Sequence, residues 1–139
     1  MISSENVKAY VERMASGEPA PGGGAAGALQ AALGAALVAM SARYTTDPGH
    51  ASDAELVAAR AEELIPEALR LADADAEAFR AVAAAFALPR DSEDEKAERS
   101  RAIQEATVGA AQPPLFPLVW PTVIINLPGV LIGAFARRA

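Results

Sequence analysis

Apolar residues recur at helical spacing along most of this chain, and this pattern predicts a protein built of helices. A first helix, at about residues 4–15, has apolar residues three or four positions apart: Val7, Tyr10, Val11 and Met14. A second, at about residues 23–45, has large apolar residues on one side: Leu29, Leu33, Leu37, Met40 and Tyr44. Its other positions are mostly Ala and Gly, whose small side chains let helix backbones approach closely. We therefore expect this helix to be central and surrounded, partly by another subunit.

A third helix is predicted after a turn at residues 47–51. The segment Ser52-Asp53-Ala54-Glu55 is typical of a capping box, in which serine and glutamate satisfy each other's backbone N–H groups. Pro66 removes one helix hydrogen bond, so we expect a kink in the first third of this helix. Its apolar residues follow in steps of three and four: Ala61, Leu64, Ala68, Leu71, Phe79, Val82 and Phe86.

One step of that apolar stripe is filled by a carboxylate, Asp75. A carboxylate on an apolar helix face is costly unless it is paired, hydrogen-bonded or protonated. Asp75 is therefore either a satisfied core acid or a functional group, and the periodicity leaves both interpretations open. Asp73 and Glu77 instead share a face with Arg70 and Arg80, so we expect these two acids to be solvated.

A second capping box, Ser92-Glu93-Asp94-Glu95, opens a fourth helix that we expect to end near Ala111. The sequence then becomes rich in proline and apolar residues, and residues 122–125 form either a short strand or an extended packed tail. Two uncharged runs, residues 19–42 and 106–136, raise the question of a membrane. The first is mostly Ala and Gly and prolines interrupt the second, so we interpret both as buried protein.

The second helix is preceded by the segment Pro19-Ala20-Pro21-Gly22-Gly23-Gly24. The prolines favour an extended entry, while the glycines permit unusual backbone angles and let a ligand approach the main chain closely. A helix that begins here presents unpaired N–H groups and the positive end of its dipole, which suits an anionic or electron-rich ligand. The alternative is a tight turn that only begins a buried helix, and the local pattern leaves both open.

Composition narrows the functional classes. The 139 residues suit a single domain, and a net charge of −6 without a sizeable basic cluster argues against a nucleic-acid partner. The chain has no Cys and only one His, His50, so it has no disulfide or cysteine nucleophile, and we expect no metal site. The N-terminus lacks the pattern of a signal peptide, so we expect a cytoplasmic protein.

Three stretches, in this order, resemble the motifs of one known family. The first is P-A-P-G-G-G with the alanine-leucine helix after it, over residues 19–40. The second is D-A-D-A-E-A-F at residues 73–79, followed by Leu88-Pro89, and the third runs from residue 102 to Gln112-Pro113-Pro114. Together they resemble the cyclodeaminase/methenyltetrahydrofolate cyclohydrolase family, over roughly the first four-fifths of the chain. This is the folate-handling helical domain found alone in bacteria or fused to a formiminotransferase.

Two features depart from the family pattern. In the family, the exit at residues 112–114 leads into two or three further helices, whereas here the chain passes almost directly to residues 123–127, which resemble the family's closing stretch. We therefore expect the family's C-terminal helices to be missing after residue 114, either as an omitted segment or in a shortened, degenerate member. The family's lysine-rich turn after the second helix is replaced by residues 46–50, which puts contacts with the folate glutamate tail in doubt.

The helical pattern and the resemblance together imply an all-α fold, an antiparallel multi-helix bundle that pairs as an intertwined homodimer. The resemblance implies a folate-dependent enzyme whose substrate is a tetrahydrofolate derivative. It either hydrolyses 5,10-methenyltetrahydrofolate to 10-formyltetrahydrofolate or cyclises formiminotetrahydrofolate with release of ammonia, and the absence of a fused transferase favours the first. We expect Asp75 to be the catalytic carboxylate, with a ligand slot formed by the substrate-binding residues Pro21, Gly22, Gly23 and Gly24.

Two other classes of protein stay open at this stage. One is a non-catalytic helical dimer that kept the family's core and lost its site along with the missing helices. The other is a membrane-associated protein that uses residues 106–136, although we expect neither a membrane nor a nucleic-acid partner.

Overall fold

The computed structural model describes residues 1–119, and the side chains of residues 1–111. The predicted strand or tail at residues 122–125 therefore lies outside the described residues. Within them the regular structure is helical, which confirms the all-α prediction. The elements in order are η1 (Ile2–Ser4), α1 (Val7–Ala15), α2 (Gly23–Arg43), η2 (Pro48–His50), α3 (Ala51–Phe86) and α4 (Glu93–Val119).

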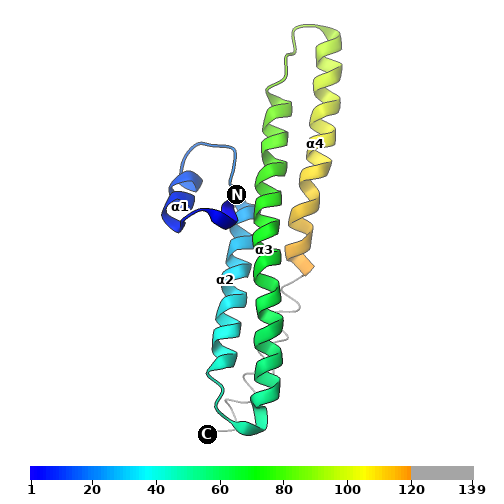
Figure 1. The fold of residues 1–139 in the computed structure, drawn as a ribbon. Helices are drawn as coiled ribbons and strands as arrows, with labels where there is room; N and C mark the ends of the chain where they lie inside the picture. Colours follow the sequence, from blue (N-terminus) through cyan, green and yellow to red (C-terminus); the bar gives the residue numbers. More distant parts are fainter. Residues whose placement is uncertain (120–139) are drawn as a thin grey trace.

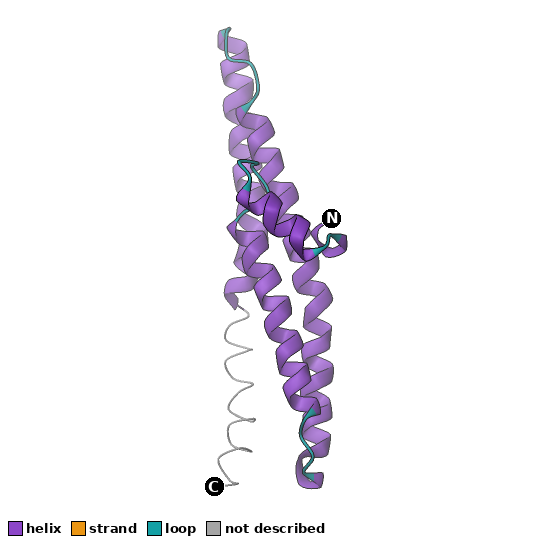
Figure 2. Ribbon diagram, turned by 90° about the vertical axis from the view of Figure 1, so that its left-hand side faces the viewer, coloured by secondary structure: helices purple, strands orange, loops and turns teal. Residues whose placement is uncertain are grey.

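Three long antiparallel helices form the body of the structure, and α3 lies between α2 and α4 (Figure 1). Helix α2 packs along the first part of α3, and α4 returns along its later part. The short helix α1 lies to the side, near the beginning of α2 and the N-terminus (Figure 2). The prediction that α2 is central is thus wrong for the single chain, because α3 makes the main contacts with both other long helices.

Alanine side chains form the contact between α2 and α3. The buried residues of α2 are six alanines spaced three or four positions apart: Ala25, Ala28, Ala32, Ala35, Ala39 and Ala42. They face a similar surface of α3, whose buried residues include Val57, Ala58, Ala61, Ala68, Leu71, Ala72 and Ala76. Small side chains on both helices permit a close approach of the two backbones, so it is the alanine face of α2 that becomes buried.

Most of the predicted stripe of large apolar residues on α2 consequently points away from α3. Leu33 and Leu37 are each 60% exposed, Met40 is 49% exposed and Tyr44 is 77% exposed. Leu29 is the exception, because it is partly buried and packs against the core at the beginning of α2. From Leu33 onward, the stripe does not pack within the single chain. On α1 the apolar face is similarly divided, since Tyr10 is buried whereas Val7 and Val11 are exposed.

The beginnings of α1 and α3 differ from the predictions. Helix α1 begins at Val7, three residues later than predicted, because the Asn6 side chain caps it by accepting a hydrogen bond from the Ala9 N–H at 2.9 Å. The predicted capping box at residues 52–55 does not cap α3, which already begins at Ala51 after a one-turn helix. Asp47 caps that preceding turn instead, by accepting from the Gly49 N–H at 2.8 Å.

The second predicted capping box is confirmed. The Glu95 carboxylate accepts from the N–H groups of Asp91 and Ser92, each at 2.9 Å, and the Glu95 N–H donates to Ser92 Oγ at 3.2 Å. These hydrogen bonds from the Ser92 and Asp91 backbone lower the pKa of Glu95 below its ordinary value.

Two helices contain proline. Helix α3 runs through Pro66 as one helix, and the kink expected there stays a prediction. Helix α4 extends to Val119 rather than ending near Ala111. The restricted φ of proline, about −65°, lies in the helical range, so Pro66 is accommodated within α3 at the loss of one backbone hydrogen bond.

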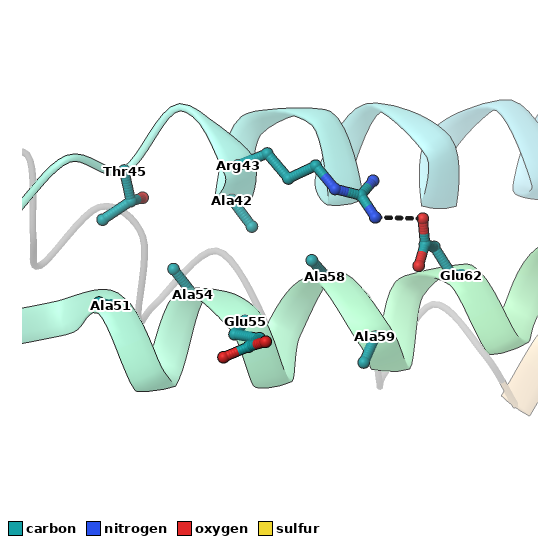
Figure 3. A pocket seen from close by; sticks show the side chains of 9 residues that line it. All are labelled: Ala42, Arg43, Thr45, Ala51, Ala54, Glu55, Ala58, Ala59 and Glu62. Carbon is teal, nitrogen blue, oxygen red and sulfur yellow. Dashed lines mark hydrogen bonds and ion pairs between the residues drawn. The ribbon is translucent and has the colours of Figure 1, made fainter.

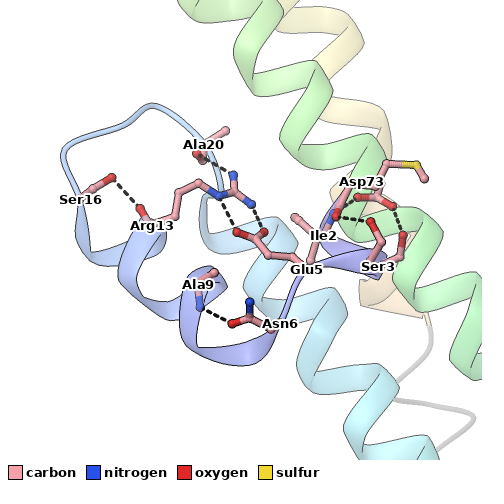
Figure 4. Close-up of polar contacts among 11 residues, drawn as sticks. Ile2, Ser3, Glu5, Asn6, Ala9, Arg13, Ser16, Ala20 and Asp73 are labelled. Atoms are coloured by element: carbon pink, nitrogen blue, oxygen red, sulfur yellow. Dashed lines mark hydrogen bonds and ion pairs between the residues drawn. The ribbon is translucent and has the colours of Figure 1, made fainter.

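Asp73 ties the N-terminal turn to α3 (Figure 4). Its carboxylate accepts hydrogen bonds from the Ile2 N–H and from Ser3 Oγ, the latter at 2.7 Å. The prediction that Asp73 is solvated beside Arg70 is therefore wrong, and Arg70 pairs with Glu67 at 2.6 Å. Sequence spacing placed Asp73 beside the arginines of its own helix, but it gave no information on a partner seventy positions earlier.

Arg13 holds α1 against the proline-rich segment that leads into α2 (Figure 4). Its guanidinium pairs with Glu5 and also donates to the carbonyl oxygen of Ala20 at 3.3 Å. The hydrogen bond from Arg13 lowers the pKa of Glu5 below its ordinary value. Asp73 and Arg13 together fix the N-terminal residues over the beginning of α2.

We predict that Asp73→Ala lowers the free energy of unfolding by about 1–3 kcal/mol, because it leaves the partly buried Ile2 N–H without its acceptor. Urea denaturation measures this difference, and amide hydrogen exchange should become faster at Ile2 and Ser3. Glu77→Ala is the matched control, since Glu77 lies on the same helix and is exposed. Equal stability of the two variants would contradict the role of Asp73 as an anchor.

Candidate functional site

Asp75 lies at the beginning of α2, although fifty positions separate it from that helix in sequence. Its Oδ2 atom accepts a hydrogen bond from the Ala25 N–H at 2.8 Å. The N-cap residue of α2 is Gly22, which makes no side-chain cap. The carboxylate of α3 therefore supplies the cap that α2 lacks, at the end of the helix where a negative charge is favoured.

Gly24 leaves the space that the Asp75 carboxylate occupies. A Cβ atom at position 24 would lie 2.0 Å from Oδ1 and 2.8 Å from Oδ2 of Asp75. Any side chain at this position would therefore displace the carboxylate. At Gly22 and Gly23 the corresponding space is open.

The glycine-rich segment is used for close approach and not for unusual backbone angles. None of the glycines among the described residues has a positive φ, so this part of the sequence-based interpretation is wrong. The preceding Ala20–Pro21 peptide bond is cis. The close approach that the glycines were expected to permit is real at Gly24, where the approaching group is the Asp75 side chain of the same chain.

Asp73 and Asp75 have different partners because they lie on different sides of α3. Residues two positions apart in an α-helix are separated by roughly 200° around its axis. Asp73 therefore reaches the N-terminal turn, while Asp75 reaches α2. Asp75 is half-buried, and its neighbours Ala72 and Ala76 on α3 are buried. The predicted apolar stripe is thus buried before Asp75, at Ala61, Ala68 and Leu71, but beyond Asp75 the prediction is wrong, since Phe79 and Phe86 are exposed.

The site retains free hydrogen-bonding capacity. Within the described residues, Asp75 Oδ1 accepts no hydrogen bond, and the N–H groups of Gly23 and Gly24 donate none. A carboxylate that is held through one oxygen can accept a proton at the other, while free N–H groups at a helix beginning can bind an electron-rich atom. The structure therefore brings Asp75 to the end of the glycine-rich segment, at Gly24, with Gly23, Gly22 and Pro21 directly before it. The roles predicted for these residues stay a prediction.

Tyr10 is a candidate that the sequence analysis did not identify. It was assigned to an apolar face, and it is indeed buried, with 5% of its surface exposed. Its hydroxyl oxygen is also buried and has no hydrogen-bond partner within the described residues. Burial raises the pKa of Tyr10 above its ordinary value; the Arg13 charge acts against this rise, and the charges of Glu5 and Asp75 add to it. The sequence signal that could have identified Tyr10 is its hydroxyl, because a residue on a buried apolar face is more simply a phenylalanine.

A separate cavity of about 440 Å³ lies at the opposite end of α2 (Figure 3). Its lining includes Glu55, Glu62 and Arg43, and Arg43 is paired with Glu62. Helix α2 has 21 residues, so this cavity is about 30 Å along the helix from the glycine-rich segment. Two carboxylates against one guanidinium do not favour a polyanionic ligand, and the cavity contains none of the predicted site residues.

Among the described residues, no group of three or more His, Cys, Asp or Glu could hold a metal ion.

Comparison with known proteins identifies the family. Residues 6–117 match the family described as formiminotransferase-cyclodeaminase, and the chain belongs to this family. It is 36% identical over 119 residues to a methenyltetrahydrofolate cyclohydrolase of Methylorubrum extorquens, a match that covers 83% of this chain and 57% of the relative. The resemblance noted in the sequence is thereby confirmed.

Two mammalian relatives are named for cyclodeaminase activity. The formimidoyltransferase-cyclodeaminases of Rattus norvegicus and Sus scrofa are each 32% identical to this chain, over 126 and 125 residues. These matches cover 79% and 78% of this chain and 21% of each relative. The chain thus spans a little over half the length of the bacterial relative and about a fifth of the mammalian ones.

We predict that Gly24→Ala lowers the free energy of unfolding by about 1–2 kcal/mol, because the new Cβ displaces Asp75 and removes the cap of α2. Gly23→Ala is the matched control and should leave stability unchanged or raised, since space there is open and alanine favours a helix. Urea denaturation of both variants measures the difference.

The same substitutions in an Asp75→Ala background test whether displacement of the carboxylate is the cause. Without the carboxylate, Gly24→Ala should lower the free energy of unfolding no more than Gly23→Ala does. A larger loss of stability in Gly24→Ala that persists without Asp75 would contradict the close approach of Asp75 to Gly24 as its cause.

Proposed function

We propose that this chain is a folate-dependent one-carbon enzyme that hydrolyses 5,10-methenyltetrahydrofolate to 10-formyltetrahydrofolate. The observation that carries the proposal is the Asp75 carboxylate, held by the Ala25 N–H with Oδ1 beside Gly24. Membership of the formiminotransferase-cyclodeaminase family supports the substrate class. The relative with 36% identity is named for this reaction.

The chemistry of the substrate suits a single carboxylate. The 5,10-methenyl bridge is an amidinium cation, and its carbon is open to attack by water. Asp75 Oδ1 takes a proton from the attacking water as the new C–O bond forms. Cleavage of the bond between this carbon and N5 then leaves a formyl group on N10: N5 takes the proton held by Asp75, and the proton of the added hydroxyl is released to solvent as the C=O bond forms. A negative charge beside the cationic bridge also stabilises the approach of the substrate.

The glycine-rich segment contributes its backbone. The absence of side chains at Gly22, Gly23 and Gly24 lets a flat pteridine ring lie close to the main chain. The free N–H groups of Gly23 and Gly24 are suited to its ring oxygen and nitrogen atoms or to a substrate carboxylate. Pro21 directly precedes the three glycines and borders the surface that they offer to the pteridine ring.

Cyclisation of formiminotetrahydrofolate is the second candidate reaction. The rat and pig relatives carry cyclodeaminase in their names, which favours it, and their matches include the Asp75 region of the family. In that reaction N10 closes on the formimino carbon that N5 carries, and ammonia leaves. The same carboxylate would move the proton from the closing nitrogen to the leaving amine.

We predict that Asp75→Asn lowers turnover by about 100-fold or more, because asparagine can still accept the Ala25 hydrogen bond but cannot take a proton from water. Loss of the methenyl absorbance, corrected for spontaneous hydrolysis, measures the rate. Circular dichroism should show an intact helical fold, and Glu77→Gln should retain wild-type turnover. Ammonia release from formiminotetrahydrofolate is assayed in parallel.

Two results would contradict the assignment. Full turnover in Asp75→Asn would remove this residue from the mechanism. A wild-type protein without turnover of either folate would favour a non-catalytic helical member of the family.

We further infer that two copies of the chain pair through α2. The support is the exposed stripe of Leu33, Leu37 and Met40 on a helix that carries no charged residue before Arg43. Contiguous exposed apolar surface of this kind is typical of an interface. Among the described helices, α2 is also the one that is long and apolar enough to cross a membrane, with a mean hydropathy of 1.6 and a third of the stretch buried. The test must therefore distinguish a second copy of the chain from a lipid bilayer as the partner of this exposed stripe.

We predict a discrete dimer by analytical ultracentrifugation of protein purified without detergent. The double substitution Leu33→Glu and Leu37→Glu should convert it to a monomer, because each places a charge in the apolar interface. Val108→Glu, at an equally exposed apolar position on α4, is the matched control. A monomeric wild-type protein, or one that needs detergent, would overturn the proposed dimer.

A further inference from the structure

Arg13 forms the most enclosed ion pair among the described residues. Its guanidinium donates two hydrogen bonds to the Glu5 carboxylate, from Nε at 3.2 Å and from Nη2 to the other oxygen. The two side chains are 22% and 20% exposed, whereas each other ion pair in the described part of the chain has a side chain that is more than half exposed. Exposed ion pairs contribute little to stability, but a two-point pair that is shielded from water fixes the orientation of its guanidinium. Glu5 therefore holds Arg13 in one direction.

The third hydrogen bond of this guanidinium reaches the beginning of the glycine-rich segment. Arg13 Nη1 donates to the carbonyl oxygen of Ala20 at 3.3 Å (Figure 4). Residues 14–19 between them are exposed, whereas Ala20 is buried and belongs to the same core cluster as Ala25. Arg13 thus bridges an exposed loop and holds the first buried residue that follows it.

The glycines that come next have no side chains to hold them in place. At Gly22 and Gly23 no neighbouring atom lies within 4 Å of the position that a Cβ would take. Glycine also loses more conformational freedom on folding than any other residue. The order of this segment therefore depends on its two ends. Asp75 holds the later end, and Arg13 holds the earlier end through the carbonyl oxygen of Ala20.

We propose that Arg13 is a positioning residue that holds the glycine-rich segment, through Ala20, in the conformation that receives the folate. This inference rests on the proposed function, in which the backbone of the glycines lies against the pteridine ring. Loss of Arg13 should weaken substrate binding, because a loose segment must be ordered each time the substrate binds. The chemical step should change little, since proton transfer belongs to Asp75.

The first experiment compares Arg13→Met with Arg60→Met. Methionine keeps an unbranched apolar stem but has no hydrogen-bond donor. Arg60 is 69% exposed and pairs with Glu63 at 2.9 Å within α3, so it is the matched control. We expect Arg13→Met to raise KM for methenyltetrahydrofolate about tenfold, while kcat falls less than about threefold. Arg60→Met should change neither quantity. A merely structural role would reduce the fraction of folded enzyme, and hence the apparent kcat, without raising KM.

A double-mutant cycle with Glu5→Gln tests whether Glu5 acts through Arg13. Glutamine keeps the size of the side chain but removes its charge, so the guanidinium is no longer held in one direction. Glu5→Gln alone should raise KM about threefold, and in an Arg13→Met background it should raise KM no further. Effects of the two substitutions on KM that multiply would overturn the inference.

Amide hydrogen exchange measures the order of the segment without substrate. The Ala26 N–H donates to the carbonyl oxygen of Gly22 at 3.1 Å, so its exchange rate reports on the glycine-rich segment. We expect this rate to rise at least about threefold in Arg13→Met and to stay unchanged in Arg60→Met. Exchange at Ala39, further along α2, should be unchanged in both variants.

Each outcome decides the inference. An unchanged KM in a folded, active Arg13→Met protein overturns it, and so does an unchanged exchange rate at Ala26. If Arg13→Met does not fold, Glu5→Gln decides, and an unchanged KM in this milder variant overturns the inference. If the wild-type protein turns over no folate, the proposed function fails, while exchange at Ala26 still decides whether Arg13 orders the segment.

Discussion

The hydrogen bond between the Asp75 carboxylate and the Ala25 N–H is the contact on which the arrangement of this protein depends. It joins the beginning of α2 to the middle of α3, and it offsets the cost of placing a carboxylate on an apolar face. The contact requires a helix beginning without its own side-chain cap and a position without Cβ, which Gly22 and Gly24 provide. The same geometry leaves one carboxylate oxygen free, so the stabilising contact and the candidate chemistry share a single side chain.

Alanine packing between α2 and α3 has a consequence for the outer surface. Because the six buried alanines of α2 occupy one side, Leu33, Leu37 and Met40 lie on the other side, where the single chain leaves them exposed. Such a helix buries little apolar area for each residue, since an alanine side chain is a single methyl group. A second copy packed on the exposed stripe would add the large apolar contacts that the α2–α3 contact lacks.

Local signals in the sequence predicted part of the local structure. The capping box at Ser92 and Glu95 formed as predicted, because both partners lie within one helical turn. The similar box at residues 52–55 did not form a cap, because the helical turn that Asp47 caps leads into α3 before it. Asp75 was identified because a charged residue interrupts an apolar period, a signal that does not require knowledge of its partner. Two other predictions failed because they depended on distant contacts: the bonds of Asp73 to the N-terminal turn, and the choice of the alanine face of α2 over its leucine face. Residue spacing identifies the faces of a helix, but packing decides which face is buried.

The two aspartates of the D-A-D segment differ in role: Asp73 anchors the N-terminal turn, and Asp75 is the proposed catalytic group. Asp73 uses both carboxylate oxygens on the N-terminal turn, which fixes its side chain there. Asp75 uses one oxygen on α2 and keeps the other. Since the N-terminal turn leads directly into α1, the anchor at Asp73 also determines where Arg13 lies relative to Ala20. A change at Asp73 should therefore reach the site through the position of α1, even though its carboxylate contacts neither Arg13 nor the glycine-rich segment.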